Sequence, residues 1–327
     1  MNRRKLLVAF GLGALAEAMP ALAQQKGKVR RIGFLYFGSR QSAVARYDAF
    51  LRGMRELGYV AGKDFVVEER YADGKNELAQ TQAAEMARLK VDVIVVAGNP
   101  ALHAARRVTT TLPIVSTTSP DPVADGYAAS LARPGGNVTG LATGNVELVP
   151  KHIELLKFAV PKLTRIGVLM NPANTAHPPQ LKTLQDTAQS AGIQLVPLNA
   201  GNPEDIERGI AAMARERSQA LLILGDTFFT QQSKQIAELA LKHHLASTYT
   251  QREYAKAGGL MSYGQDVIDN FRRAAGHVDK IFKGAKPGDL PFERYTRTHM
   301  AINRKTAKAL GITISQELLL RADEVIE

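Results

Sequence analysis

Apolar and polar positions follow two rhythms along the chain, short apolar runs and longer segments with helical spacing. The apolar runs at residues 31–36, 91–96 and 113–116 have the length and the Val/Ile content of buried strands. Between the first two, residues 42–57 and 77–89 place apolar side chains three or four positions apart, which is typical of amphipathic helices. This order of elements predicts a parallel sheet with helices on both faces.

The same rhythm starts again in the second half of the chain. Residues 165–170 (RIGVLM) resemble residues 31–36 (RIGFLY), and residues 220–225 resemble residues 93–98. Such self-similarity predicts two α/β lobes of similar construction, each a Rossmann-like doubly wound sheet. One long doubly wound sheet is the alternative that the pattern leaves open.

Turn-rich runs at residues 133–140, 258–264 and 286–291 lie at the joins of this pattern. Three breaks between two lobes predict a chain that crosses several times, and such connections form a hinge whose lobes close on a ligand. We therefore expect an N-terminal lobe and a C-terminal lobe, each formed by two separate segments of the chain. Their expected extents are residues 29–142 plus about 259–284, and residues 143–258 plus about 285–327.

The N-terminus has the three parts of a secretory signal peptide. Arg3, Arg4 and Lys5 precede an apolar run at residues 6–16, and Ala21-Leu22-Ala23 forms a small-x-small cleavage site. We predict a signal peptide over residues 1–23, which is recognised by the Sec or the twin-arginine export machinery. A short N-terminal helix packed on the core is the alternative. The remaining chain has no apolar run long enough to span a bilayer, so we expect a soluble exported protein.

Composition sharpens this picture. The net charge of +11 falls to +9 when residues 1–23 are removed, and the basic residues form no block of five or more. We therefore interpret the charge as a solvated surface and expect no nucleic-acid partner. The chain has no Cys, which excludes disulfides, thiolate chemistry and a lipid-modified N-terminal Cys. The mature protein is accordingly expected to be free in the periplasm.

Several longer motifs resemble a known family. They are LARPGGNVTG at 131–140, AGGLMSYG at 257–264, RRAA at 272–275, VDKIFKGAKP at 278–287 and RADEVI at 321–326. From about residue 30 to the C-terminus the chain is similar to ABC-transporter substrate-binding proteins of the tryptophan/tyrosine-binding type. The resemblance implies a type I periplasmic-binding-protein fold, two lobes closing as a Venus flytrap. It also implies capture of a small molecule, an amino acid and in some members an aromatic one, for delivery to an inner-membrane permease.

Catalytic signatures are missing from the sequence. It has no G-x-S-x-G elbow, no Walker A motif and no H-E-x-x-H, so we expect no enzyme, no cofactor and no metal site. An exported α/β enzyme, or a ligand sensor acting on a small carboxylate, is the alternative function. We expect a monomer whose partners are the ligand and the permease.

Ligands of open parallel sheets bind beyond the carboxyl ends of the strands, where helix N-termini offer unpaired N–H groups. This rule names the candidate ligand-binding residues in both lobes. They are Tyr36, Phe37, Gly98, Asn99, Ser116, Thr117, Thr118, Asn171, Asp226, Thr227, Phe228 and Tyr263.

Each candidate also has a structural interpretation. Asp226 is placed to bind an ammonium group or to cap the helix that follows it. The hydroxyls of Thr117 and Thr118 suit a carboxylate, yet they also suit the turn before Pro120. Asn99 has the position of a helix cap. Aromatic walls are expected from Tyr36 and Phe228, while Phe37 fits a core position equally well.

Overall fold

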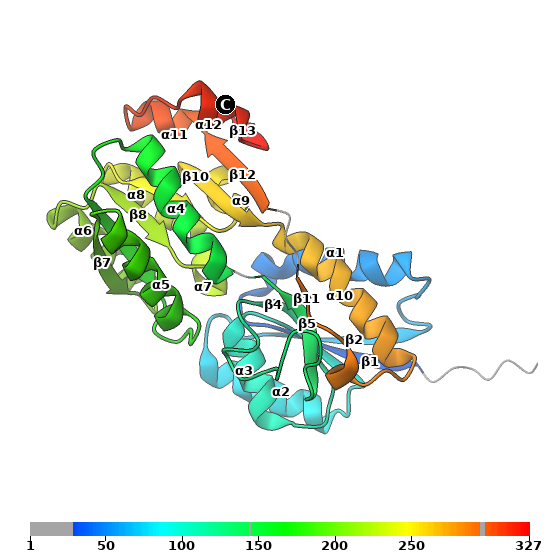
Figure 1. The fold of residues 1–327 in the computed structure, drawn as a ribbon. Helices are drawn as coiled ribbons and strands as arrows, with labels where there is room; N and C mark the ends of the chain where they lie inside the picture. The colour runs from blue at the N-terminus through cyan, green and yellow to red at the C-terminus, as the bar shows by residue number, and fades with distance from the viewer. Residues whose placement is uncertain (1–28, 144, 295–297) are drawn as a thin grey trace, which may run out of the picture.

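The computed structural model describes residues 29–143, 145–294 and 298–327. These residues form two α/β lobes, each built on its own sheet, with helices on both faces of each sheet (Figure 1). The separate sheets exclude the alternative of one long sheet. The predicted signal peptide at residues 1–23 lies outside the described residues.

The sheet of the N-terminal lobe is parallel throughout, in the order β11-β5-β4-β3-β1-β2. Its strands are β1 (Arg30–Tyr36), β2 (Phe65–Tyr71), β3 (Val93–Ala97), β4 (Ile114–Ser119), β5 (Val138–Ala142) and β11 (Glu293–Arg294). Its helices are α1 (Arg40–Glu56), α2 (Asn76–Arg88), α3 (Asn99–Val108) and α10 (Val267–Phe282), with the 3-10 turn η1 (Pro287–Asp289).

The sheet of the C-terminal lobe has the order β13-β12-β10-β9-β8-β6-β7, and only the β10–β12 pair is antiparallel among its described strands. The strands are β6 (Arg165–Met170), β7 (Gln194–Asn199), β8 (Ala220–Ile223), β9 (Ala246–Tyr249), β10 (Met261–Gln265), β12 (Thr298–Asn303) and β13 (Glu324–Ile326). The helices are α4 (Asn145–Ala159), α5 (His177–Ser190), α6 (Pro203–Arg215), α7 (Thr227–Gln231), α8 (Ser233–Lys242), α9 (Arg252–Lys256), α11 (Arg304–Ala309) and α12 (Gln316–Leu320).

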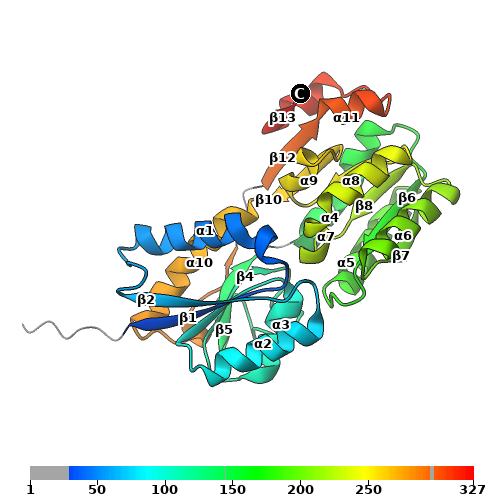
Figure 2. The same ribbon diagram turned by 180° about the vertical axis from the view of Figure 1, so that it is seen from behind.

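Each sheet separates two apolar cores because successive side chains of a strand point to opposite faces. In β1, Phe34 packs with Phe50 of α1 and Phe271 of α10. The neighbouring Leu35 belongs to the opposite core, which contains Met86 of α2. Figure 2 shows the same layering from behind, with α1 and α10 on one face of the N-terminal sheet and α2 and α3 on the other.

The predicted internal repeat is visible in the packing of glycines. A Cβ on Gly33 of β1 would lie 2.7 Å from the sulfur of Met86, and a Cβ on Gly167 of β6 would lie 2.4 Å from the sulfur of Met213. In both lobes, then, a glycine in the first strand makes room for a methionine on the helix that follows the second strand. The repeated RIG motif encodes the same contact twice.

The chain crosses between the lobes after β5, after β10 and after β11. The first crossing lies where it was predicted, but the predicted extents of the lobes are wrong at the other two. Residues 261–265 belong to the C-terminal lobe, because β10 pairs with β9 and β12. Residues 285–294 belong to the N-terminal lobe, because β11 pairs with β5 and the Gly135 amide donates to the Gly288 carbonyl at 3.0 Å.

The glycines that suggested these two breaks have other functions. The amide of Gly259 donates to the carbonyl of Tyr254 at 2.8 Å, so the Gly258-Gly259 pair ends α9 and turns the chain into β10. The run at residues 286–291 forms η1, which packs against Gly135 and Gly136. Two of the predicted turn-rich runs therefore contact each other inside one lobe.

His152 of α4 is a buried histidine whose titration couples stability to pH. Its Nδ1 lies 2.9 Å from the hydroxyl of Thr248, and burial lowers the pKa of His152 to about 4. The unfolded chain binds this proton at a pKa of about 6.5. Between these values the unfolded state holds more protons, so stability is fully present above pH 6.5 and falls as the pH drops toward 4.

We expect the unfolding free energy of the native chain to fall by roughly 3 kcal/mol more than that of a His152→Gln variant between about pH 7 and about pH 4. Urea unfolding at both pH values measures the difference. The exposed His103 of α3 provides the control, since His103→Gln should follow the native curve. Parallel pH dependence in the native chain and His152→Gln would contradict the assignment.

Candidate functional site

A cavity lies between the carboxyl ends of the two sheets. Its volume is about 60 Å³, which is room for a few water molecules. The N-terminal lobe and the first crossing contribute Tyr36, Arg46, Ala97, Gly98, Asn99, Thr118, Pro120, Thr143, Val267 and Phe271. The C-terminal lobe contributes Asn174, Gly225, Asp226, Thr227, Thr230 and Gln251. Residues of both lobes therefore line one cavity, and Asn99 and Thr175 meet across it.

The N-terminal wall is formed by the ends of β1, β3 and β4. Gly98 precedes α3 with a φ of 91°, and Pro100 stands in the first turn of that helix. A Cβ on Gly98 would lie 2.8 Å from the hydroxyl of Thr227 in the other lobe, so this glycine allows the lobes to approach closely. Its amide donates to the hydroxyl of Thr118 at 3.4 Å. The strand ends of this wall therefore present hydroxyl and backbone groups, and its charge comes from Arg46 of α1.

Asn99 spans the cleft at this edge. Its side-chain amide donates to the hydroxyl of Thr175 in the C-terminal lobe at 3.1 Å. Burial, together with the neighbouring Asp121, raises the pKa of Asp125 to about 6, while a hydrogen bond from Asn99 opposes that rise. Gly98 rather than Asn99 occupies the cap position of α3, which corrects the interpretation of Asn99 as a helix cap.

The C-terminal wall is centred on Asp226, which is 4% exposed. Its Oδ1 accepts hydrogen bonds from the amides of Phe228 at 2.8 Å and Phe229 at 3.3 Å, so Asp226 caps α7. The side-chain amide of Asn171 donates to the same oxygen at 3.2 Å, and that of Asn174 donates to Oδ2 at 2.8 Å. Oδ2 thus accepts a single protein hydrogen bond and retains capacity for another donor.

His177 connects the segments that follow β6 and β8, which contain Asn171 and Asp226. Its Nδ1 accepts from the amide of Asn171 at 2.9 Å, and its Nε2 lies 3.2 Å from the carbonyl of Gly225. Because Nδ1 is an acceptor, the ring is neutral with its proton on Nε2. Burial lowers the pKa of His177, against the opposing field of Asp226. A neutral His177 therefore positions Asn171 and Asp226 through the backbone.

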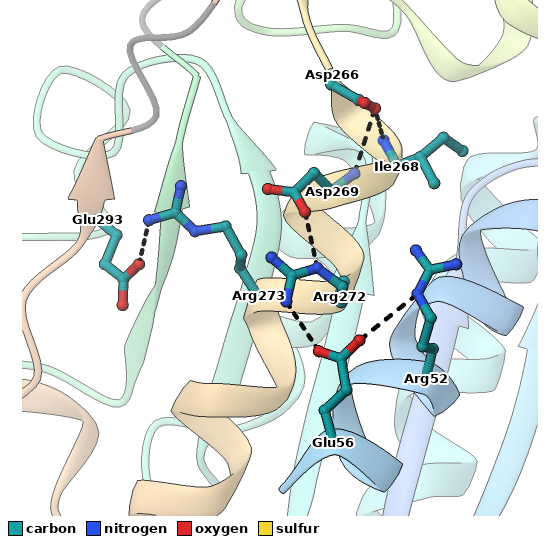
Figure 3. A network of polar contacts seen from close by, with 8 residues as sticks. All are labelled: Arg52, Glu56, Asp266, Ile268, Asp269, Arg272, Arg273 and Glu293. Carbon is teal, nitrogen blue, oxygen red and sulfur yellow. Dashed lines mark hydrogen bonds and ion pairs between the residues drawn. The ribbon is translucent and has the colours of Figure 1, made fainter.

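Elements at the hinge are tied to the N-terminal lobe by ion pairs (Figure 3). Asp266 follows the second crossing and caps α10 by accepting from the amides of Ile268 and Asp269. Arg272 of α10 then bonds to Asp269 at 2.8 Å and to Glu56 of α1 at 2.9 Å. Figure 3 also shows Arg273 bonded to Glu293 of β11, at 2.7 Å. These pairs anchor both sides of α10 near the crossings.

Half of the residues predicted from the sequence line the cavity. Those six are Tyr36, Gly98, Asn99, Thr118, Asp226 and Thr227. The rule that places ligands at strand ends accounts for all of them, because each follows or ends a strand whose carboxyl end faces the cleft.

The other six predicted residues lie outside the cavity lining. Phe37 is fully buried in the core of the N-terminal lobe, and Thr117 donates to the carbonyl of Val96 inside the sheet. Ser116 is buried against Gly140 of the neighbouring strand. All three side chains are buried inside the N-terminal lobe, and none of them lines the cavity.

In the C-terminal lobe, Asn171 does not line the cavity, and its side-chain amide donates a hydrogen bond to the carboxylate of Asp226. Phe228 packs on Phe229 with ring centroids 5.5 Å apart and belongs to the apolar core. Tyr263 accepts a hydrogen bond from the hydroxyl of Thr298 at 3.2 Å and packs against His152. The aromatic wall therefore consists of Tyr36 and Phe271.

Sequence reasoning missed Arg46, Phe271 and Gln251. A signal existed for Arg46, which stands three positions after Ala43 and four before Phe50 on the buried side of the predicted helix. A charged residue on an apolar stripe points to a buried partner. Phe271 carried no such signal, because its spacing in α10 matches an ordinary core position.

The described residues contain no group of three or more His, Cys, Asp and Glu side chains arranged to hold a metal ion. Among the helices of the described part of the chain, none is long and apolar enough to cross a membrane.

Two lobes joined by a multi-crossing hinge, with a cavity between their strand ends, define the class of two-lobed solute-binding proteins. The chain belongs to the ABC transporter substrate binding protein family, whose model matches residues 31–326. Its function is accordingly that of the substrate-binding component of an ABC transporter, and its two-lobe α/β fold is that of type I periplasmic binding proteins.

Individual relatives agree with this assignment. A tyrosine-binding protein of Clostridioides difficile is 24% identical over 285 residues, covering 87% of this chain and 82% of that protein. A conserved domain protein of Vibrio cholerae has a TM-score of 0.86 at 28% identity, over 91% of this chain and all of that one, 100%. An ABC domain of Streptococcus pneumoniae in complex with L-Trp has a TM-score of 0.84 at 24% identity, with coverage of 91% and 100%.

Proposed function

We propose that this chain captures an amino acid, preferentially an aromatic one, in the cavity between its lobes and delivers it to the permease of an ABC importer. The observation that carries the proposal is the carboxylate of Asp226. It is buried at the cavity wall, it is fixed by four hydrogen bonds, and its Oδ2 keeps capacity for another donor. A buried carboxylate with free acceptor capacity suits an ammonium group.

The remaining walls complete the chemistry of such a ligand. Tyr36 and Phe271 offer aromatic surface, while Thr118 and the first turn of α3 offer neutral donors. The tyrosine-binding relative and the L-Trp complex support the choice of an aromatic amino acid. The cavity of about 60 Å³ is too small for an aromatic side chain without movement, so binding includes displacement of the lining side chains as the lobes close.

Closure around the ligand is a shift between open and closed populations, driven by contacts that the ligand makes with both lobes. The similarity to a ligand-free, open substrate binding protein of Clostridium difficile, with a TM-score of 0.65, is lower than the 0.84 for the L-Trp complex. This difference supports a closed arrangement for the chain described here. In this function the protein has no catalytic turnover, and after export it acts as a monomer outside the inner membrane.

Thermal unfolding of the purified protein against a panel of amino acids tests the proposal. L-Tryptophan or L-tyrosine should raise the midpoint in a dose-dependent way, by an amount equivalent to about 2.7 kcal/mol at 100 times Kd. Sugars and polyols serve as controls, because they lack the ammonium group that Asp226 is proposed to bind. No shift with any amino acid, or an equal shift with myo-inositol, would overturn the assignment of the ligand class.

A further inference from the structure

Arg46 is a buried cation at the interface of the two lobes. It lies on α1 of the N-terminal lobe, and its side chain is only 7% exposed. Its Nη1 donates to the carbonyl of Ser42 at 3.0 Å, one turn earlier in the same helix. Its Nη2 donates to Gln251 at 3.3 Å and to Glu253 at 3.2 Å, both in the C-terminal lobe. The guanidinium is therefore held across the cleft.

These contacts leave part of the guanidinium unused. An arginine has five N–H groups, and the bonds to Ser42, Gln251 and Glu253 employ three of them. The Nε–H and one Nη1–H have no protein acceptor among the residues that the structure describes, although Arg46 lines the cavity. The guanidinium thus keeps spare charged donors in a cavity that it lines, and such donors favour an anionic occupant.

The charges of the cavity are arranged in opposition. Arg46 comes from the N-terminal lobe and Asp226 from the C-terminal lobe, and both line the same small space. An α-amino acid carries an ammonium and a carboxylate on one carbon, so it can neutralise both walls at once. Guanidinium groups match carboxylates in shape and donor spacing, which neutral hydroxyls such as that of Thr118 do not.

We infer that Arg46 binds the carboxylate of the ligand and makes that carboxylate a requirement for recognition, an inference that rests on the proposed function. Because Arg46 also holds Gln251 and Glu253 of the opposite lobe, the carboxylate is bound at the contact that closes the cleft. The ligand class is thereby narrowed to zwitterionic α-amino acids, and simple amines and amino-acid amides are excluded as good ligands.

A cycle of variants and ligands tests this inference. Isothermal calorimetry compares L-tryptophan and L-tyrosine with their carboxamides, at about pH 6 so that the amino groups stay protonated. The native chain should prefer the acids by about 10- to 100-fold, and Arg46→Gln should lose this preference. Arg52→Gln is the matched control, since Arg52 lies on the same helix, is 52% exposed and contacts Glu56 at 3.9 Å.

A second variant separates carboxylate binding from lobe closure. Glu253→Gln removes the ionic partner of Arg46, and it should weaken acid and amide together while keeping the preference for the acid. Equal weakening of both ligands by Arg46→Gln would overturn the inference and reduce Arg46 to a contact between lobes, as would a native chain that does not distinguish acid from amide. If neither amino acid binds the native chain, the proposed function itself fails.

Discussion

Replacement of Asp226 by asparagine is expected to lower the affinity for L-tyrosine or L-tryptophan by about 100-fold. The variant keeps the shape of the side chain but removes the charge that faces the ligand ammonium, and such charged hydrogen bonds contribute roughly 2–5 kcal/mol when one partner is truncated. Calorimetric titration measures the loss. The ligand analogue without the amino group isolates the interaction, because its affinity should be nearly unchanged by the substitution.

Asp186→Asn is the matched control for this change. Asp186 lies on α5 of the same lobe and is exposed, so its substitution should leave affinity within about twofold of native. Asp226 also caps α7, and for that reason the melting temperature of Asp226→Asn must be recorded beside its affinity. An unchanged affinity for the amino acids would remove Asp226 from the ammonium site.

Substitution of Gly140 by alanine is expected to destabilise the N-terminal lobe by roughly 4 kcal/mol. Gly140 of β5 has a φ of 138°, and a Cβ there would lie 2.0 Å from the carbonyl oxygen of Ser116 on β4. Backbone strain and steric overlap act together, because β4 cannot move without disturbing the sheet. Thermal unfolding should show a melting temperature lower by on the order of 10 °C.

Gly136→Ala provides the control within the same turn-rich run. Its nearest neighbour to a new Cβ is the carbonyl oxygen of Tyr127 at 4.0 Å, and its backbone does not require glycine. We expect a change of less than about 0.5 kcal/mol. A native melting temperature for Gly140→Ala would show that β4 and β5 separate more easily than the packing indicates.

The elements of the fold follow closely from periodicity. The helices predicted at residues 42–57 and 77–89 are α1 and α2, each within two residues of the predicted bounds, and β1 begins one residue before the predicted strand. Periodicity succeeds because it reports local burial. Periodicity did not predict which lobe contains β10. That strand lies with its hydrogen-bonded partners β9 and β12, and its own sequence does not specify them.

Half of the candidate ligand-binding residues were predicted correctly as cavity-lining residues, because strand ends can be located from the local pattern. Strand ends named Gly98, Thr118 and Asp226, because the topology of a parallel sheet brings carboxyl ends together. Phe271 enters the cavity only because the chain returns to the N-terminal lobe and packs α10 beside β4 and α1. The sequence predicts the return of residues 259–284 to the N-terminal lobe, but its spacing does not show that Phe271 reaches the cavity.

By itself, then, the sequence determined two similar sets of α/β elements and the strand ends that carry the cleft, and the structure showed that these sets form two separate sheets. Only the tertiary structure decided where the chain crosses, that Asp226 caps α7 while facing the cavity, and that Arg46 meets Gln251 and Glu253 across it. The physical reason is the range of the forces involved. Which residues of a strand or helix are buried depends on their near neighbours in the sequence. Charges from two lobes face each other only when distant segments of the chain are brought together by folding.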